Sequence, residues 1–264
     1  MTSPRSFEDL VAEGAAVPVD GWDFSWFEGR ATEARPSWGY ARALAGRLGR
    51  AAAVLDVQTG GGEVLDGALG AAGHRPALVV ATEGWAPNVP RAAARLHPHG
   101  VAVVAAEEGA ALPFADGVFD LVVSRHPVRP GWAEIARVLR PGGTYFAQHV
   151  GPASAFELVE FFLGPQPQWA RSGRDPERER ADAEAAGLDV LPVRAERLRM
   201  EFHDIGAVVH FLRKVVWMVP GFTVEAYVDR VRALHERIEA EGSFVAYSSR
   251  HLVDARKKRP AAGA

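Results

Sequence analysis

The stretch Val54-Leu55-Asp56-Val57-Gln58-Thr59-Gly60-Gly61-Gly62-Glu63 decides the fold. The apolar run from Ala51 to Leu55 is typical of a buried strand, and an acidic residue, three consecutive glycines and a helical segment follow it. Strand, glycine-rich turn and helix build the nucleotide pocket at the carboxyl end of the first strand in doubly wound α/β sheets. Glycines there let the backbone approach a ligand where a Cβ atom would collide.

The chain after this turn alternates between apolar strand-like runs and helical segments. Such alternation predicts βαβ units, and therefore a parallel sheet with right-handed crossovers. We expect a seven-stranded, mostly parallel Rossmann-like α/β sheet with helices on both faces. The expected strands are 51–56, 77–83, 101–105, 119–124, 144–150, 188–202 and 244–255.

Two regions lie outside this alternation. Residues 1–40 are dense in aromatic residues, and Trp22 and Trp26 are four positions apart, so on a helix they share a face. This segment is expected either to pack onto the core or to act as a lid over a substrate pocket. Residues 41–264 then form the main domain, in which 203–242 is a helical insertion expected to cover the substrate side.

Composition and charge limit the function classes. The chain has 264 residues, a net charge of −3 and a pI of about 6.3, so no basic field favours nucleic acid as a partner. The absence of cysteine excludes disulfides, thiolate metal sites and a cysteine nucleophile. No signal peptide and no apolar run of about 20 residues is visible, which predicts a cytoplasmic protein without a membrane span. A monomer or a homodimer is expected.

The glycine spacing argues against phosphate-bearing cofactors. The dinucleotide pattern G-x-G-x-x-G would place glycines at 58, 60 and 63, but the chain has Gln58, Gly60 and Glu63. No Gly-Lys-Ser/Thr sequence follows, which excludes a Walker A loop. Glu63 at the start of the helix would also repel a pyrophosphate. The acid Glu83 lies at the spacing from which a second-strand carboxylate reaches ribose hydroxyls, which fits a nucleoside without phosphate.

Four blocks, in order, resemble the class I S-adenosylmethionine-dependent methyltransferases, in particular the small-molecule enzymes of ubiquinone and menaquinone biosynthesis. The stretch 54–62 resembles motif I, and Val80-Ala81-Thr82-Glu83 resembles the acidic end of the second strand. The block 107–122 resembles the acidic, Leu-Pro-Phe and Phe-Asp region, and Val138-Leu139-Arg140-Pro141-Gly142-Gly143 resembles the turn before the fifth strand. One position departs from the family pattern, because Gln58 replaces the first of three alternating glycines.

This resemblance implies S-adenosyl-L-methionine as the cofactor and assigns roles to residues. Glu83 would accept hydrogen bonds from the ribose hydroxyls, and Glu108 would accept one from the adenine amino group, with Gly109 donating from its backbone. The remaining residues expected around the cofactor are Asp56, Gln58, Gly60, Gly61, Gly62 and Ser124.

Candidates for chemistry on the acceptor lie at the carboxyl ends of the later strands. His126 and His149 are candidate general bases because histidine titrates near neutrality. The expected substrate pocket includes Trp22, Trp26, Arg125, His203 and His210. The histidine spacing predicts no metal site.

The sequence therefore predicts a methyltransferase that acts on a small, largely apolar acceptor. Two alternatives stay open: a nucleic-acid methyltransferase, and a non-catalytic member that keeps the fold. The acidic pI disfavours the first, and Gln58 is the feature that supports the second.

Overall fold

The computed structural model describes residues 5–19, 21 and 24–259. The chain forms two compact units. The first consists of Met1–Arg35, Pro152–Gly173 and Arg197–Ser249, and the second of Pro36–Gly151, Arg174–Glu196 and Arg250–Ala264. Each unit is assembled from three separate segments, so neither is a continuous stretch of sequence.

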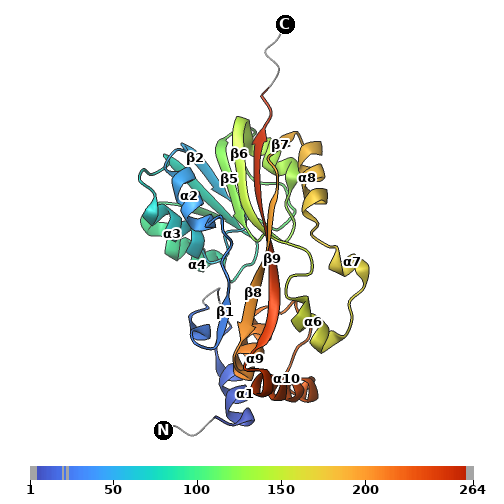
Figure 1. The fold of residues 1–264 in the computed structure, drawn as a ribbon. Helices are drawn as coiled ribbons and strands as arrows, with labels where there is room; N and C mark the ends of the chain where they lie inside the picture. The colour runs from blue at the N-terminus through green and yellow to red at the C-terminus, as the bar shows by residue number, and fades with distance from the viewer. Residues whose placement is uncertain (1–4, 20, 22–23, 260–264) are drawn as a thin grey trace. The chain divides into compact units, whose positions relative to one another are not determined.

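Nine strands are present in the described part of the chain (Figure 1). They are β1 (Ala31–Glu33), β2 (Ala53–Asp56), β3 (Leu78–Glu83), β4 (Ala102–Ala105), β5 (Phe119–Arg125), β6 (Leu139–Val150), β7 (Leu188–Val190), β8 (Arg194–Phe202) and β9 (Phe244–Lys257). Their hydrogen-bonded order is β1-β8-β9-β6-β5-β2-β3-β4, and β7 also pairs with β9.

Helices connect these strands. The helices are α1 (Phe7–Ala16), α2 (Tyr40–Leu48), α3 (Glu63–Ala71), α4 (Val89–Leu96), α5 (Trp132–Val138), α6 (Phe156–Leu163), α7 (Gln168–Arg171), α8 (Pro176–Ala185), α9 (Ile205–Lys214) and α10 (Val228–Glu241), with short 3₁₀ turns at Ser25–Phe27 and His97–His99. None of the described helices is both long and apolar enough to span a bilayer.

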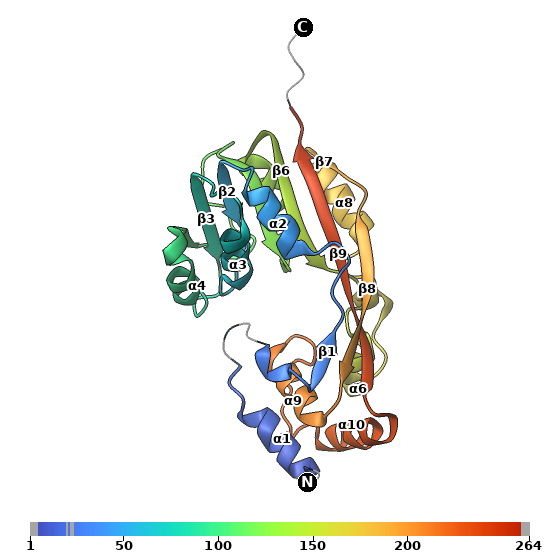
Figure 2. The same cartoon turned by 60° about the vertical axis from the view of Figure 1, so that its left-hand side comes forward.

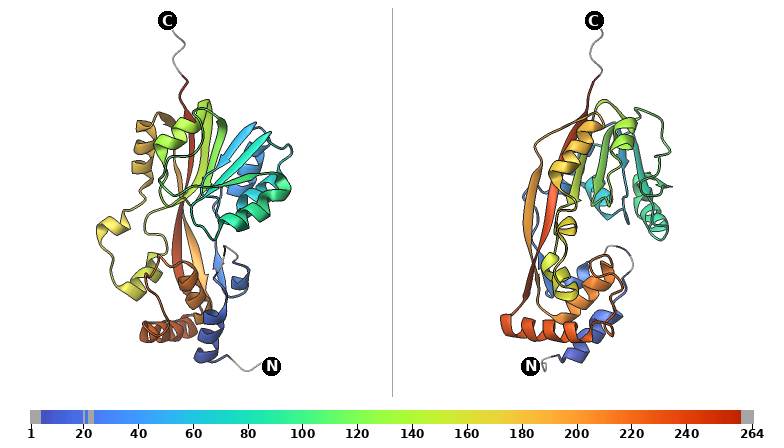
Figure 3. Two further views of the ribbon diagram at one scale, coloured as in Figure 1. Left: turned by 180° about the vertical axis from the view of Figure 1, so that it is seen from behind. Right: turned by 90° about the vertical axis from the view of Figure 1, so that its right-hand side faces the viewer.

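The second unit is a doubly wound sheet. Strands β2 to β6 pair in parallel, and β9 runs antiparallel to β6. Successive residues of a strand point to opposite faces of the sheet. Val54 and Leu55 therefore pack into two separate apolar cores, one on each face. Helices α2, α3 and α4 cover the Val54 face, and α5 and α8 cover the Leu55 face (Figures 2 and 3). This arrangement confirms the predicted α/β fold.

The sheet has nine strands and not the seven expected. The stretch 188–202 forms two strands, because Pro192 lies between β7 and β8 and has no backbone N–H to donate to a ladder. The additional strand β1 has only three residues and pairs with β8. The predicted turn at 140–143 is also part of a strand: β6 starts at Leu139, and the irregularity falls in its register with β5.

The first unit has an apolar core built from α1, α6, α9 and α10. Helices α1 and α9 cross at two glycines, where a Cβ atom on Gly14 would lie 2.3 Å from the carbonyl oxygen of Gly206. A Cβ atom on Gly206 would lie 2.5 Å from the carbonyl oxygen of Leu10. Any side chain at either position would force the two helix backbones apart.

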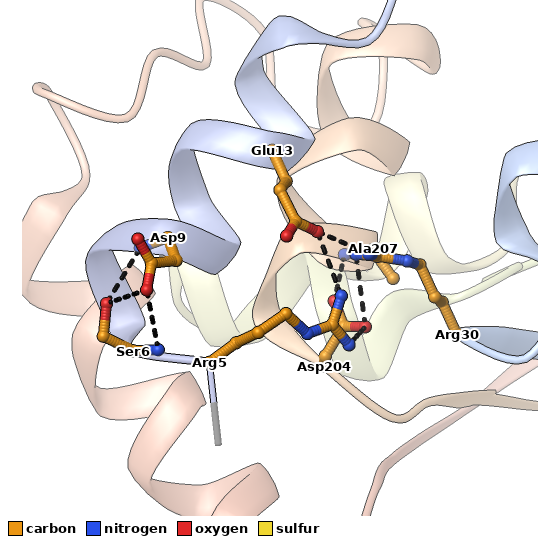
Figure 4. A network of polar contacts seen from close by, with 7 residues as sticks. All are labelled: Arg5, Ser6, Asp9, Glu13, Arg30, Asp204 and Ala207. Atoms are coloured by element: carbon orange, nitrogen blue, oxygen red, sulfur yellow. Dashed lines mark hydrogen bonds and ion pairs between the residues drawn. The ribbon is translucent and has the colours of Figure 1, made fainter. Parts of the chain in front are cut away.

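A polar network caps the N-terminus of α9 in the same unit (Figure 4). Asp204 caps the helix by accepting a hydrogen bond from the Ala207 backbone N–H at 2.8 Å. Its other oxygen faces the guanidinium groups of Arg5, at 3.8 Å, and Arg30, at 3.5 Å. Both arginines also pair with Glu13 on α1, so charge pairing joins the N-terminal helix to the cap of α9.

Candidate functional site

The glycine turn joins the end of β2 to α3 and is fixed by both neighbouring strands. The Val57 N–H donates to the Val123 carbonyl at 2.8 Å, and the Thr59 N–H donates to the Thr82 carbonyl at 2.8 Å. Gly60 and Gly62 have φ values of 67° and 84°, a region that glycine enters without a steric penalty. The turn therefore has a defined backbone at the carboxyl edge of the sheet.

Gln58 holds the adjacent loops together. Its φ of 58° is left-handed, which is costly for a residue with a side chain. The side-chain amide donates to the Ala106 carbonyl at 3.1 Å and accepts from the Gly84 N–H at 3.0 Å. Gly84 itself lies so close to the loop after β4 that a Cβ atom would come within 2.9 Å of the Ala106 oxygen. The Gln58 amide thus links the ends of β3 and β4.

Glu83 ends β3 with its carboxylate against the glycine turn. One oxygen accepts from the Gly60 N–H at 2.7 Å and the other from the Trp85 N–H at 2.7 Å. The side chain is buried, and burial raises the pKa of Glu83 although the backbone hydrogen bonds oppose it. Each carboxylate oxygen can accept a second hydrogen bond, so the pair of oxygens fits a ribose diol.

Asp56 and Ser124 lie beside this turn on neighbouring strands. The Thr59 hydroxyl donates to the Asp56 carboxyl at 2.7 Å, and the Ser124 hydroxyl donates to the Val57 carbonyl at 2.8 Å. Burial raises the pKa of Asp56 to about 7, the Thr59 hydrogen bond opposes the rise, and the Glu83 charge adds to it. At neutral pH this carboxyl group is partly protonated.

Glu108 and Gly109 lie in the loop after β4 and are exposed. The Glu108 carboxylate accepts a hydrogen bond from the Arg129 N–H at 2.7 Å. Gly109 has a φ of 77°. The assignment of both residues to the adenine stays a prediction.

His126 follows β5 and is held by Gln148 at the end of β6. The Trp38 indole N–H donates to the amide oxygen of Gln148 at 2.8 Å, which turns the amide nitrogen of Gln148 toward His126 Nε2 at 2.9 Å. His126 Nε2 therefore accepts this hydrogen bond, and burial keeps the pKa of His126 well below its usual value. Arg125 precedes it and is exposed.

His149 is fully buried, and the structure places it in a cluster that the sequence did not predict. Its Nδ1 lies 2.6 Å from a Glu179 carboxylate oxygen, and its Nε2 lies 3.0 Å from the Tyr145 hydroxyl. His251 Nε2 lies 2.8 Å from the same Glu179 oxygen. The missed residues, Glu179 and His251, belong to a charged helix and to the final strand, and only the pairing of β6 with β9 links them to His149.

The other predicted substrate residues belong to the first unit. His210 is buried on α9, with its ring 5.1 Å from Trp26 and 5.0 Å from Phe27. Burial, together with the charges of Lys214 and Arg213, lowers the pKa of His210 to about 4. His203 is exposed, and Trp22 lies outside the described residues. Their role in a substrate pocket stays a prediction.

The segment that contains the glycine turn is similar to a known domain. Residues 55–147 match a family model described as a methyltransferase domain. This segment of the chain is therefore similar to a methyltransferase domain. The matched segment runs from Leu55 in β2 to Ala147 in β6 and so contains the glycine turn, Glu83 and Ser124. A search of curated proteins gave no match.

Solved structures of low sequence identity share the fold of this chain. A candidate methyltransferase from Bacillus halodurans is 18% identical, with a TM-score of 0.53, over 78% of this chain and 92% of that chain. A candidate sarcosine dimethylglycine methyltransferase from Galdieria sulphuraria is 17% identical, with a TM-score of 0.50, over 82% and 81%.

A third structure carries the cofactor product. Phosphoethanolamine N-methyltransferase 2 from Haemonchus contortus, solved with phosphomonomethylethanolamine and S-adenosylhomocysteine, is 17% identical with a TM-score of 0.53. The match covers 97% of this chain and 61% of that one. The chain thus shares its fold with methyltransferases solved with S-adenosyl-L-methionine or S-adenosylhomocysteine, and the first of these is the cofactor that the sequence predicts.

Proposed function

We propose that this chain is a methyltransferase that transfers the methyl group of S-adenosyl-L-methionine to a small, largely apolar acceptor. The observation that carries the proposal is the pairing of Glu83 with Gly60 at the carboxyl edge of the sheet. This pairing puts a carboxylate with free lone pairs beside a backbone that a nucleoside can approach. The family match over the same residues supports it.

The small size of the acceptor is supported by the solved structures named above. Two of them carry names or bound molecules that are small amines or their phosphates.

The chain's own residues act by binding and orientation. Glu83 would hold the two ribose hydroxyls, and the glycine turn would accept the methionine end without steric conflict. When bound, S-adenosyl-L-methionine supplies an activated methyl group on a sulfonium. Alignment of the acceptor with this group supplies most of the acceleration, so a general base is needed only for an acceptor that loses a proton. His126 stays the first candidate for that role. His149, the second, would have to give up its contact with Glu179 or Tyr145 to act as a base.

Calorimetric titration with S-adenosyl-L-methionine tests the proposal. We expect the wild-type chain to bind the cofactor and Glu83→Ala to bind it about 100-fold more weakly, because two charge-assisted hydrogen bonds are lost. Glu239→Ala is the matched control, since this acid is exposed on α10 in the other unit. Equal affinity of Glu83→Ala and wild type would remove Glu83 from the site, and no binding to the folded wild type would refute the proposal.

The non-catalytic alternative rests on Gln58. Its amide bonds both Gly84 and Ala106, which lie in the loops that also carry Glu83 and Glu108. A chain that binds the cofactor but transfers no methyl group to a panel of amines, thiols and phenols would favour this alternative. Methyl transfer to RNA in the same assay would favour the nucleic-acid alternative.

A further inference from the structure

Three elements that are distant in the sequence bring two histidines and a glutamate to one point. His149 on β6 and His251 on β9 are directly paired in the antiparallel register, so their side chains lie on the same face of the sheet. Helix α8 covers this face, since its Ala183 packs in the same core as Tyr145 and Val253, and it supplies Glu179. All three residues belong to the second unit.

The donor atoms form a compact set. His149 Nδ1, His251 Nε2 and one Glu179 oxygen all lie within 4.8 Å of one another. The two histidines are almost completely buried, and Glu179 is only slightly exposed. Among the described residues, no other group of three histidine, aspartate or glutamate side chains has this spacing. Such a donor set of two imidazoles and one carboxylate also occurs in zinc enzymes.

Tyr145 completes the arrangement as an outer partner. Its hydroxyl contacts the second ring nitrogen of His149 at 3.0 Å. Metal-binding histidines usually donate this second N–H to a neighbouring acceptor, which fixes the ring and its tautomer. When His149 Nδ1 binds a cation, its proton sits on Nε2 and is donated to the Tyr145 oxygen, so the ring itself releases no proton.

We propose that His149, Glu179 and His251 form a binding site for one divalent transition-metal cation such as Zn²⁺. Imidazole nitrogen suits Zn²⁺, whereas Mg²⁺ and Ca²⁺ prefer sets of oxygen ligands. Three protein ligands leave the fourth tetrahedral position to water or to a substrate atom. The site does not depend on methyl transfer. The proposal differs from the expectation based on the histidine spacing, which considered only residues near each other in sequence.

The test measures metal binding directly. Tag-free full-length protein is stripped with a chelator and dialysed, and Zn²⁺ alone is then titrated by calorimetry, with the bound metal counted by mass spectrometry. We expect one Zn²⁺ per chain in the wild type. In His251→Ala and Glu179→Gln we expect the affinity to fall at least about 100-fold, because a direct ligand is lost, and in Tyr145→Phe about 10-fold.

A matched control is available in the same unit. His99 lies 2.7 Å from Asp66, as a surface histidine–carboxylate pair without a third ligand, so His99→Ala should bind Zn²⁺ as the wild type does. Glu179→Gln keeps the size of the side chain, which protects the test if His251→Ala fails to fold. No stoichiometric uptake by the folded wild type, or unchanged binding in folded Glu179→Gln, would show a hydrogen-bonded cluster only and would overturn the proposal.

Discussion

Asp56 lies at the glycine turn, and Glu179 lies in the His149–Glu179–His251 cluster. Both are carboxyl groups of the second unit, yet folding shifts their pKa values in opposite directions. Burial raises the pKa of Asp56 to about 7, since it has one hydroxyl partner and the like charge of Glu83 nearby. Burial acts on Glu179 in the same sense, but two imidazole partners lower its pKa to about 2. The hydrogen-bond donors, and not burial alone, determine which carboxyl group is charged.

The largest effect is expected at the cluster. In metal-free buffer, Glu179→Ala should lower the free energy of unfolding by about 3 kcal/mol, because two buried imidazole N–H groups lose their acceptor. Urea denaturation measures it. Asp182→Ala, an exposed acid on the same helix, is the control and should have little effect. Similar stabilities of the two variants would show that Glu179 does not stabilise the fold through its two imidazole partners.

Glu179 and Asp56 should also differ in how their contributions to stability depend on pH. The pKa of Glu179 falls from its usual 4.5 to about 2 on folding, so its contribution is fully present above pH 4.5 and is lost as pH falls toward 2. Glu179→Gln should therefore flatten the acid limb of the stability curve. Thermal unfolding across this range measures the slope, and an unchanged slope would contradict the assignment.

Asp56 should show the reverse dependence with a smaller effect. Its pKa rises from 3.8 to about 7 on folding, so its contribution is fully present below pH 3.8 and is lost as pH rises through 7. Asp56→Asn keeps an acceptor for Thr59, and at about pH 8 it should gain roughly 1 to 2 kcal/mol over wild type. The gain should shrink at about pH 5. Asp182→Asn, at an exposed site, should show no such trend.

The smallest effect on stability is expected at Gln58, where the readout is cofactor affinity. In the wild type, the left-handed backbone of Gln58 costs about 1 kcal/mol, and Gln58→Gly removes this strain. The substitution also removes two hydrogen bonds to backbone groups. The two effects oppose each other, so the free energy of unfolding should change by less than about 1 kcal/mol. It also opens the space between Gly84 and Ala106. Calorimetry should therefore show tighter binding of S-adenosyl-L-methionine, and weaker binding would show that the amide supports the cofactor.

The glycine turn can be predicted from the sequence, whereas the His149–Glu179–His251 cluster cannot. The glycine turn is local: Asp56, Gly60 and the start of α3 are neighbours in sequence, so their pattern indicates both the turn and its partner Glu83. The cluster is not local. It requires the register that pairs His149 with His251 and the placement of α8 over that pair, and neither follows from residue spacing. The extra strand β1 was missed for a related reason, since its pairing with β8 is likewise long-range.

The crossing of Gly14 and Gly206 has a consequence for synthesis on the ribosome. Helix α1 leaves the exit tunnel well before α9, because the α9 backbone against which it packs is made only after most of the second unit. Until α9 is made, the apolar face of α1 therefore has no packing partner there, whereas strands β2 to β6 can already pair. A high separation between contacting residues also slows folding, so α1 should be among the last elements to gain protection in a pulse-labelling hydrogen-exchange experiment.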